Sequence, residues 1–238
     1  MNREGHLAEA IDLLQRVATR HAPAALASSF GAEDMVLTDL IARFALPVAV
    51  FTLDTGRLPE ETYALIDRVR ARYGIPIEVH YPDAHALEDF VLANGVNGFY
   101  RSVELRRRCC AIRKTAPLTL ALAGRGAWIT GQRRSQSITR SDIAIEEFDA
   151  EHALPKFNPL AAWGDEEVWS YLSSHDVPVN PLHARGYPSI GCAPCTRAIE
   201  PGEDIRAGRW WWEHPEQREC GLHRHPVKAA IPLVQVEA

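Results

Sequence analysis

The chain has 238 residues, 46% of them hydrophobic, and a formal net charge of -5. This length suits one medium-sized domain with a buried core and an appended segment. An acidic chain without an apolar run of bilayer length is expected to have no general nucleic-acid partner and no membrane span. Its first residues are typical of a charged amphipathic helix and not of a signal peptide, so we expect a cytoplasmic protein.

Hydrophobic spacing predicts alternating helices and strands along most of the chain. A helix is expected over 7–17, and a strand of small residues follows at 24–28. The later predicted elements are strands at 48–53, 77–81, 128–130 and 143–148, and helices at 35–44, 59–74, 112–123 and 166–173. Such alternation predicts an α/β fold, a parallel twisted sheet flanked by helices. From Pro178 onward, Pro, Gly and Trp residues indicate an irregular cap or lid.

Two polar turns follow predicted strands. In S-S-F-G-A-E-D, the backbone N–H groups of Ser28, Ser29 and Gly31 are expected to face a phosphate at a helix N-terminus. The second turn, L-D-T-G-R-L, contains Leu53 and Asp54 at the same carboxyl edge of the sheet, where ligands of open parallel sheets bind. The two turns together indicate a nucleotide site, although the first alone is compatible with an ordinary strand-to-helix turn. Asp34 and Asp54 are expected to cap turns and not to act as acids or bases.

The five cysteines are distributed as two doublets and a single residue. Cys109 and Cys110 are adjacent, and their diverging side chains need an unusual local backbone to share one metal ion. A cubane offers each sulfur a separate iron, so the tandem pair, with Cys192 and Cys195, favours a 4Fe-4S cluster. Structural zinc and plain unpaired thiols are the alternatives.

The fifth cysteine, Cys220, is then free to act as a nucleophile. Arg218 and His223 are positioned in the sequence to lower the pKa of its thiol. A buried thiol, or a zinc ligand together with His223 and His225, is the alternative. Lys114 follows the cysteine pair by one helical turn and is expected near both cluster and substrate, its alternative being a solvated lysine.

The motifs carry a family resemblance. From about residue 26 to residue 223, in order, the chain resembles the assimilatory sulfonucleotide reductases, and more closely the iron-sulfur adenylyl-sulfate (APS) reductases. The matching segments are S-F-G-A-E-D, L-D-T-G-R-L, C-C-A-I-R-K-T-A-P-L, G-Q-R-R-S-Q-S-I-T-R, K-F-N-P-L, G-Y-P-S-I-G-C-A-P-C-T-R, G-R-W-W-W-E and E-C-G-L-H. The resemblance implies an adenine-nucleotide α-hydrolase-like fold, a 4Fe-4S cluster and a mobile C-terminal segment with the nucleophile.

It also implies a reaction. Cys220 would attack the sulfur of APS, releasing AMP and leaving an enzyme S-sulfocysteine, from which thioredoxin or a similar dithiol would release sulfite in assimilatory sulfate reduction and cysteine biosynthesis. The chain would divide into a nucleotide-binding region carrying the cluster, 1–200, and a segment carrying the catalytic cysteine, 201–238. Homo-oligomers are compatible with this expectation. The positions that match substrate contacts of the family are Lys114, Arg140, Arg206 and Arg209, and His223 is added to this set.

Some positions and functions stay open at this stage. Arg133 and Arg134 are weaker candidates for substrate binding, and Trp210 to Trp212 are expected to pack the lid and not to stack on adenine. The basic run before Cys109 is compatible with the extra 3'-phosphate of PAPS, so a PAPS-using or dual reductase is one alternative. A thiolating or ATP-pyrophosphatase enzyme would show a second Gly in the first turn, and a non-enzymatic iron-sulfur sensor would lack turnover dependent on Cys220.

Overall fold

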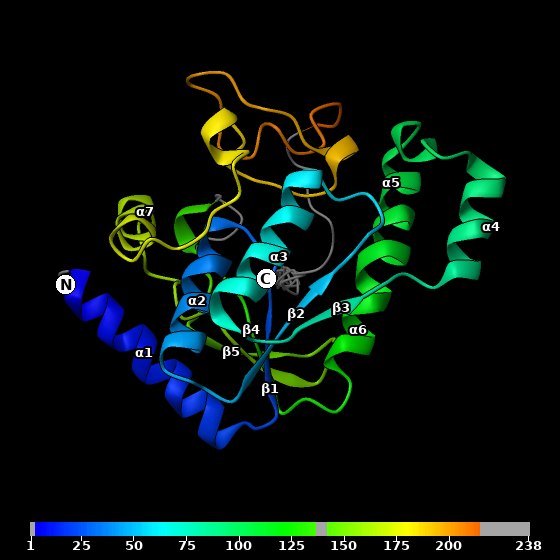
Figure 1. The fold of residues 1–238 in the computed structure, drawn as a ribbon. Coiled ribbons are helices and arrows are strands. Elements are labelled where there is room, and N and C mark those ends of the chain that lie inside the picture. Colours follow the sequence, from blue (N-terminus) through cyan, green and yellow to red (C-terminus); the bar gives the residue numbers. More distant parts are fainter. Residues whose placement is uncertain (1–2, 137–141, 215–238) are drawn as a thin grey trace, which may run out of the picture.

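The computed structural model describes residues 3–136 and 142–214, and within them six strands form one sheet (Figure 1). The strand order is β3-β2-β1-β4-β6-β5, and every neighbouring pair is parallel except β5 with β6. This confirms the predicted α/β class, with one antiparallel strand at the edge. The strands are β1 (Ala24–Ala27), β2 (Val48–Leu53), β3 (Ile77–His80), β4 (Ala127–Ile129), β5 (Glu146–Asp149) and β6 (Leu154–Phe157).

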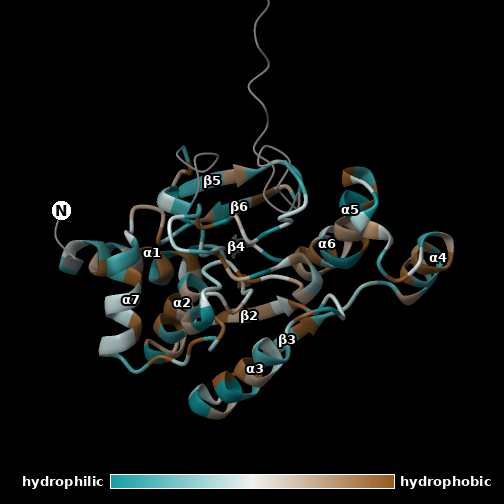
Figure 2. Cartoon of the chain, turned by 90° about the horizontal axis from the view of Figure 1, so that it is seen from above, coloured by the Kyte–Doolittle hydropathy of each residue, from teal (hydrophilic) through white to brown (hydrophobic). Residues whose placement is uncertain are grey.

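Helices cover both faces of the sheet. Figure 2 shows α1, α2, α3 and α7 on one side, and α6, followed outward by α5 and α4, on the other. Among the described helices, none is both long and apolar enough to cross a membrane. Their bounds are α1 (Arg3–Arg20), α2 (Ala32–Arg43), α3 (Glu60–Tyr73), α4 (Ala84–Asn94), α5 (Val103–Cys110), α6 (Ala116–Leu122) and α7 (Asp165–Ser174), with a π-helical turn at Ala111–Thr115 and short 3-10 helices at Gly98–Tyr100, Arg134–Gln136, His183–Arg185 and Ala193–Cys195.

The strands supply side chains to two separate apolar layers. Leu26 and Val50 join the core under α1, α2, α3 and α7, whereas the next residues, Ala25 and Phe51, face α6. This alternation is the period of two expected for strands buried on both faces. The chain runs outward from β1 to β2 and β3, and the later strands β4 and β6 lie on its other side. The reversal of direction between β1 and β4 is a topological switch point, where ligands of such sheets bind.

The structure differs from the predicted elements in three places. The helix expected from residue 112 begins at Val103, where the Ser102 hydroxyl accepts a hydrogen bond from Leu105 N at 3.1 Å. The three consecutive arginines at 106–108 interrupt the helical spacing of apolar residues in this segment, so the sequence pattern did not indicate a helix. Helix α4 was not predicted, because Phe90 is its one buried residue and its periodic signal is weak. Strand β6 was also missed, since Lys156 interrupts its apolar pattern, whereas residues 178–214 have no regular element longer than a short 3-10 helix, as predicted.

Candidate functional site

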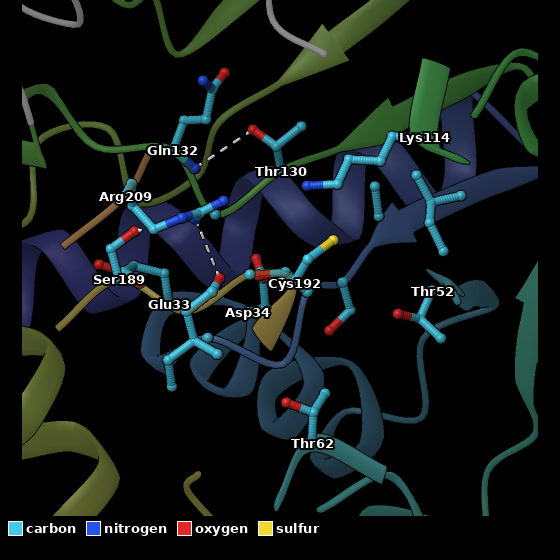
Figure 3. Close-up of a pocket in the computed structure, with 18 of the residues that line it drawn as sticks. Glu33, Asp34, Thr52, Thr62, Lys114, Thr130, Gln132, Ser189, Cys192 and Arg209 are labelled. Atoms are coloured by element: carbon cyan, nitrogen blue, oxygen red, sulfur yellow. Dashed lines mark hydrogen bonds between the residues drawn. The ribbon is translucent and has the colours of Figure 1, made fainter. Parts of the chain in front are cut away.

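A cavity of about 250 Å³ opens at the carboxyl ends of β1, β2 and β4. Its walls come from the two polar turns of the sequence, from the π-helical turn after the cysteine pair, and from residues 183–210. Figure 3 shows the side chains of Lys114, Cys192 and Arg209 around this cavity. The predicted site residues that line the cavity are Ser28, Ser29, Gly31, Leu53, Lys114, Cys192, Arg206 and Arg209.

The first turn is held by Asp34. Asp34 Oδ2 accepts hydrogen bonds from Ser29 N at 2.6 Å and from the Ser29 hydroxyl at 2.7 Å. Phe30 adopts a positive φ of 58°, and its N–H donates to the Ser28 hydroxyl at 3.2 Å. These bonds confirm the predicted turn-capping role of Asp34. The turn leads directly into α2, whose N-terminus carries the positive end of the helix dipole toward the cavity.

Asp34 is also an unusual carboxyl group. Burial raises the pKa of Asp34 to about 6, even though the two Ser29 hydrogen bonds lower it and Glu33 adds a further rise. Gly131 lies so close that a Cβ added there would meet Asp34 Oδ1 at 2.5 Å. The absence of a side chain at Gly131 therefore lets β4 approach the first turn closely.

The two residues predicted as substrate contacts in the second turn have different surroundings. Leu53 lines the cavity, but Asp54 is not among its lining residues. Asp54 Oδ1 accepts from Gly56 N and from the Tyr63 hydroxyl, both at 2.8 Å. Asp54 thus caps its turn and ties it to α3, and its predicted contact with substrate has no support in this geometry.

The cavity wall concentrates positive charge. Lys114 is buried on the π-helical turn, and Arg209 is buried beside Gly191, where an added Cβ would meet the guanidinium at 2.3 Å. Arg209 Nη1 donates to the Ser189 hydroxyl and to the Ile190 carbonyl, both at 3.4 Å. Arg206 lines the same wall. Guanidinium and ammonium groups at one wall suit phosphate and sulfate.

Other arginines have different roles. Arg133 donates to Glu33 Oε1 at 2.7 Å and to Asp165 Oδ1 at 2.5 Å, so it joins α2 to the start of α7. Arg134 donates through Nε to the Ile143 carbonyl at 2.8 Å. Neither residue lines the cavity, and nor does the basic run 101–108. The run expected to suit a 3'-phosphate therefore lies outside the described cavity wall.

Four cysteines meet beside the cavity. Cys110, Cys192 and Cys195 share a buried apolar cluster with Phe99 and Trp210, and Cys109 packs against it. All four are free thiols. Cys109 and Cys110 are the last two residues of the regular helix α5, and a π-helical turn begins directly after them at Ala111.

The thiols have different acidities. Burial raises the pKa of Cys192, but Lys114, the Thr55 hydroxyl at 3.2 Å and nearby guanidinium groups reverse this and lower it below its usual value. Burial, followed by the neighbouring Cys192 charge, raises the pKa of Cys195 to about 12, and burial also raises that of Cys109. Several thiolates packed this closely repel each other unless a metal neutralises them.

The donor set fits an iron-sulfur cluster. Two pairs of thiols from distant segments converge, and buried cations lie alongside. No three His, Cys, Asp or Glu side chains within 3–136 and 142–214 are arranged around one metal-ion position. A cubane binds each thiolate through a different iron, so its ligands need not converge on one point.

One buried ion pair was missed by sequence reasoning. Arg106, from the basic run, pairs with Glu213 of the W-W-W-E segment at 2.6 Å. The Arg106 guanidinium also lies over the Trp210 ring, 4.9 Å from its centroid. Trp210 is 1% exposed, in agreement with its predicted packing role. Of the other predicted site residues, Arg140, Cys220 and His223 lie outside the described part of the chain.

Comparison with known proteins identifies the family. The phosphoadenosine phosphosulfate reductase domain family matches residues 23–198. The adenosine 5'-phosphosulfate reductase of Burkholderia cepacia is 57% identical over 211 residues, which cover 89% of this chain and 84% of that protein. The enzyme of the same name from Allochromatium vinosum is 56% identical over 225 residues, covering 94% of this chain and 88% of that protein.

Solved structures agree with this. A phosphoadenylyl-sulfate (PAPS) reductase from Candida auris, in complex with phosphate, superposes with a TM-score of 0.69 at 25% identity, covering 80% of this chain and 90% of that chain. An NH3-dependent NAD synthetase from Campylobacter jejuni shares the fold, with a TM-score of 0.52 at 15% identity over 74% of this chain and 75% of that chain. The chain therefore belongs to the phosphoadenosine phosphosulfate reductase family, whose sulfonucleotide chemistry suits the cavity with its buried Lys114 and Arg209 beside the four cysteines.

Proposed function

We propose that this protein reduces adenylyl sulfate to sulfite and AMP, with Cys220 as nucleophile and thioredoxin or a similar dithiol as reductant. The observation that carries the proposal is the cavity at the switch point, where a strand-to-helix turn, buried cations and a cysteine doublet meet. The names of the relatives, at 56% and 57% identity, support the same substrate.

The cavity offers each part of the substrate a chemically matched wall. The turn Ser28–Gly31 and the N-terminus of α2 suit the phosphate, as helix N-termini do for anions. Lys114, Arg206 and Arg209 suit the sulfate and the bridging oxygen. Leu53 and neighbouring apolar side chains leave an uncharged surface for the adenosine. Contacts of Arg140 and His223 with the substrate are also proposed, from the sequence alone, because both residues lie outside the described part of the chain.

The chemistry needs no oxidant beyond the substrate. The Cys220 thiolate attacks the sulfate sulfur, the bond from that sulfur to the phosphate oxygen breaks, and AMP departs with the bonding electrons. A thiolate of the dithiol then attacks the Cys220 sulfur, and sulfite leaves with the electron pair of the broken S–S bond. The second thiol of the donor resolves the mixed disulfide, so both electrons come from the dithiol.

Lys114 and the arginines assist the first step. They stabilise the charge that grows on the phosphate oxygen as AMP leaves. Among the cysteines, four are assigned to metal binding, so the resolving thiols must come from another molecule.

Cys109, Cys110, Cys192 and Cys195 would hold a 4Fe-4S cluster. When bound, the cluster supplies local order and a fixed charge distribution beside the substrate, and electron transfer through it is not required. Cys192 both lines the cavity and belongs to this set, so the cluster and substrate sites share a wall. In this proposal residues 1–200 bind nucleotide and cluster, and residues 201–238 carry the nucleophile.

A PAPS-using or dual reductase is the second candidate. It is favoured by the name of the family and by the Candida auris structure. The basic run 101–108 does not line the described cavity, which favours APS. Sulfite release by anaerobically purified protein, with reduced thioredoxin and either APS or PAPS, tests both. Strong preference for APS is expected; equal turnover would favour dual use, and no turnover by iron-replete protein would favour a sensor or thiolating enzyme.

A further inference from the structure

The Arg106–Glu213 ion pair joins the cysteine helix to the end of the described chain. Arg106 Nε donates to Glu213 Oε1 at 2.9 Å, and Arg106 Nη2 donates to Glu213 Oε2 at 2.6 Å. The two side chains are 0% and 2% exposed. This bidentate geometry fixes the orientation of both groups as well as their separation. Arg106 precedes Cys110 by one helical turn, so the pair lies against the cysteine cluster.

The chain before Glu213 is held by other contacts. Arg197 N donates to the Gly208 carbonyl at 3.0 Å, and Trp210 N donates to the Cys195 carbonyl at 3.1 Å. The Arg209 guanidinium lies over the Trp210 ring, 4.6 Å from its centroid. The Trp212 ring also packs against Tyr100, with 4.5 Å between the ring centroids, so the chain is held as far as Trp212 without the Glu213 side chain. The ion pair therefore has a separate effect, which is to fix the Glu213 side chain and the direction in which the chain leaves Trp212.

Glu213 stands seven residues before Cys220 in the sequence. Seven extended residues span at most about 25 Å, so the anchor point limits where the Cys220 thiol can act. Releasing Glu213 moves the last fixed point back to Trp212 and frees the direction of the chain beyond it, which lowers the local concentration of the thiol at the substrate. Near-attack geometry is sensitive to such loss of position.

We infer that Arg106 and Glu213 are positioning residues, a clamp that fixes the root of the C-terminal segment against the cysteine helix so that Cys220 meets sulfonucleotide productively. This inference rests on the proposed function, because it assigns the clamp to the sulfur-transfer step at Cys220. Glu213 does not line the cavity and is not one of the four cysteines. A clamp that acts on the transfer step should therefore leave AMP affinity and iron content close to wild type when only the Glu213 charge is removed.

The test is Glu213→Gln in the full-length, iron-loaded protein. The readout is single-turnover transfer of labelled sulfur from saturating APS to Cys220, measured before any dithiol is added. AMP affinity, iron content and the alkylation rate of Cys220 without nucleotide are measured on the same samples. The matched control is Glu203→Gln, because Glu203 makes a similar bidentate pair with Arg197 at 2.7 Å, but on the part of the chain before Trp210.

The expected result is a fall in the transfer rate on the order of 10-fold in Glu213→Gln, with the other three quantities unchanged. Glu203→Gln should transfer sulfur at the wild-type rate. An unchanged rate in Glu213→Gln overturns the inference. A parallel loss of iron or of AMP affinity also overturns it, since it would show a general structural role.

A second variant guards against misfolding, because Glu213→Gln leaves the buried Arg106 charge without its carboxylate. The double variant Arg106→Met, Glu213→Leu removes both charges and keeps similar volume. It should bind iron and AMP normally and show the same slow transfer; transfer at the wild-type rate contradicts the clamp. If the wild-type protein itself forms no S-sulfo group on Cys220, the proposed function fails first, and the clamp inference fails with it.

Discussion

Two regions of the protein are stabilised by different interactions. One is the core between the sheet and helices α1, α2, α3 and α7; the other, called the cysteine side below, is the cluster of four cysteines with Phe99 and Trp210 at the end of α5. The first is a continuous apolar core of Leu, Val, Ile, Phe and Ala side chains from four helices and several strands. The second contains Phe99, Trp210 and cysteines, surrounded by buried charges. Apolar packing is non-directional and is complete in the polypeptide alone, whereas thiols and charges require partners in defined positions.

The charge balance on the cysteine side makes this contrast concrete. Arg106, Arg113, Lys114 and Arg209 are all less than 10% exposed, and Glu213 is the buried carboxylate that pairs with one of them. The protein as a whole is acidic, with a net charge of -5, so the positive charge on the cysteine side is a local property and does not follow from the overall composition. Buried cations are stabilised by anions. Cysteine thiolates of a cluster, and the phosphate and sulfate of a sulfonucleotide, are the anions that our proposal supplies.

The largest effect is expected from a variant that removes the proposed nucleophile and leaves both regions of the structure intact. Cys220→Ser should lower sulfite formation by about 10³-fold or more, because it removes the sulfur that accepts the sulfo group. Iron content and AMP affinity should stay at wild-type values, since neither depends on this thiol. Sulfite assays with reduced thioredoxin, together with iron analysis, measure all three. Wild-type sulfite formation by this variant would show that the nucleophile is elsewhere.

The second test acts on the cysteine side alone. Cys192→Ser should lose bound iron and should expose residues 192–213 to hydrogen exchange, while amides of β1 and β2 stay protected. The matched control is Leu65→Ala, which removes a fully buried side chain from the first core. It should lower the free energy of unfolding by about 2–5 kcal/mol and keep its iron. Equal deprotection of both regions in Cys192→Ser would mean that they unfold as one unit.

The third test concerns substrate affinity. Lys114→Ala should weaken AMP or APS binding by about 10- to 100-fold, because a buried cation at the cavity wall is lost. Arg107→Ala is the matched control, since Arg107 is exposed on the basic run and does not line the cavity. Calorimetric titration of both variants with AMP and with PAPS compares the losses of affinity. A larger loss in Arg107→Ala, particularly for PAPS, would restore the basic run as a phosphate site.

The smallest expected effect is a pH dependence at Asp34. Its pKa in the folded protein is about 6, above the ordinary value of 3.8, so the folded state binds the proton more tightly than the unfolded state. Asp34 therefore contributes stability that is fully present below pH 4 and is lost as the pH rises through about 6. Relative to Asp34→Asn, the wild type should gain roughly 2 kcal/mol of unfolding free energy between pH 7 and pH 4.

Denaturant unfolding of wild type and Asp34→Asn at several pH values measures this difference. A constant difference across the range would show that Asp34 is not protonated in the folded state near pH 6. Asp34 is hydrogen-bonded to Ser29 of the first turn and not to the cysteine side. Its titration therefore tests the stability of the first region separately from that of the cysteine side.

Much of the fold could be predicted from local patterns. The alternation of elements, the strand positions at 24–28 and 48–53, and the two polar turns were all visible, because each depends on residues close together in the sequence. The cysteine doublets likewise indicated a metal centre without any structure. Their spacing favours a 4Fe-4S cluster over structural zinc or unpaired thiols, and the family resemblance rests partly on the same segments.

What remained hidden depends on contacts between distant residues. Arg133 was a candidate for substrate binding, but it pairs with Glu33, 100 residues earlier, and with Asp165, 32 residues later. The basic run pointed to a phosphate, whereas Arg106 pairs with Glu213, 107 residues later. A charged side chain has the same appearance in sequence whether it meets water, substrate or a buried carboxylate. The sequence by itself determined which elements and chemical groups are present; only the tertiary structure decided which charges face the cavity, because pairing of buried charges depends on packing across the fold.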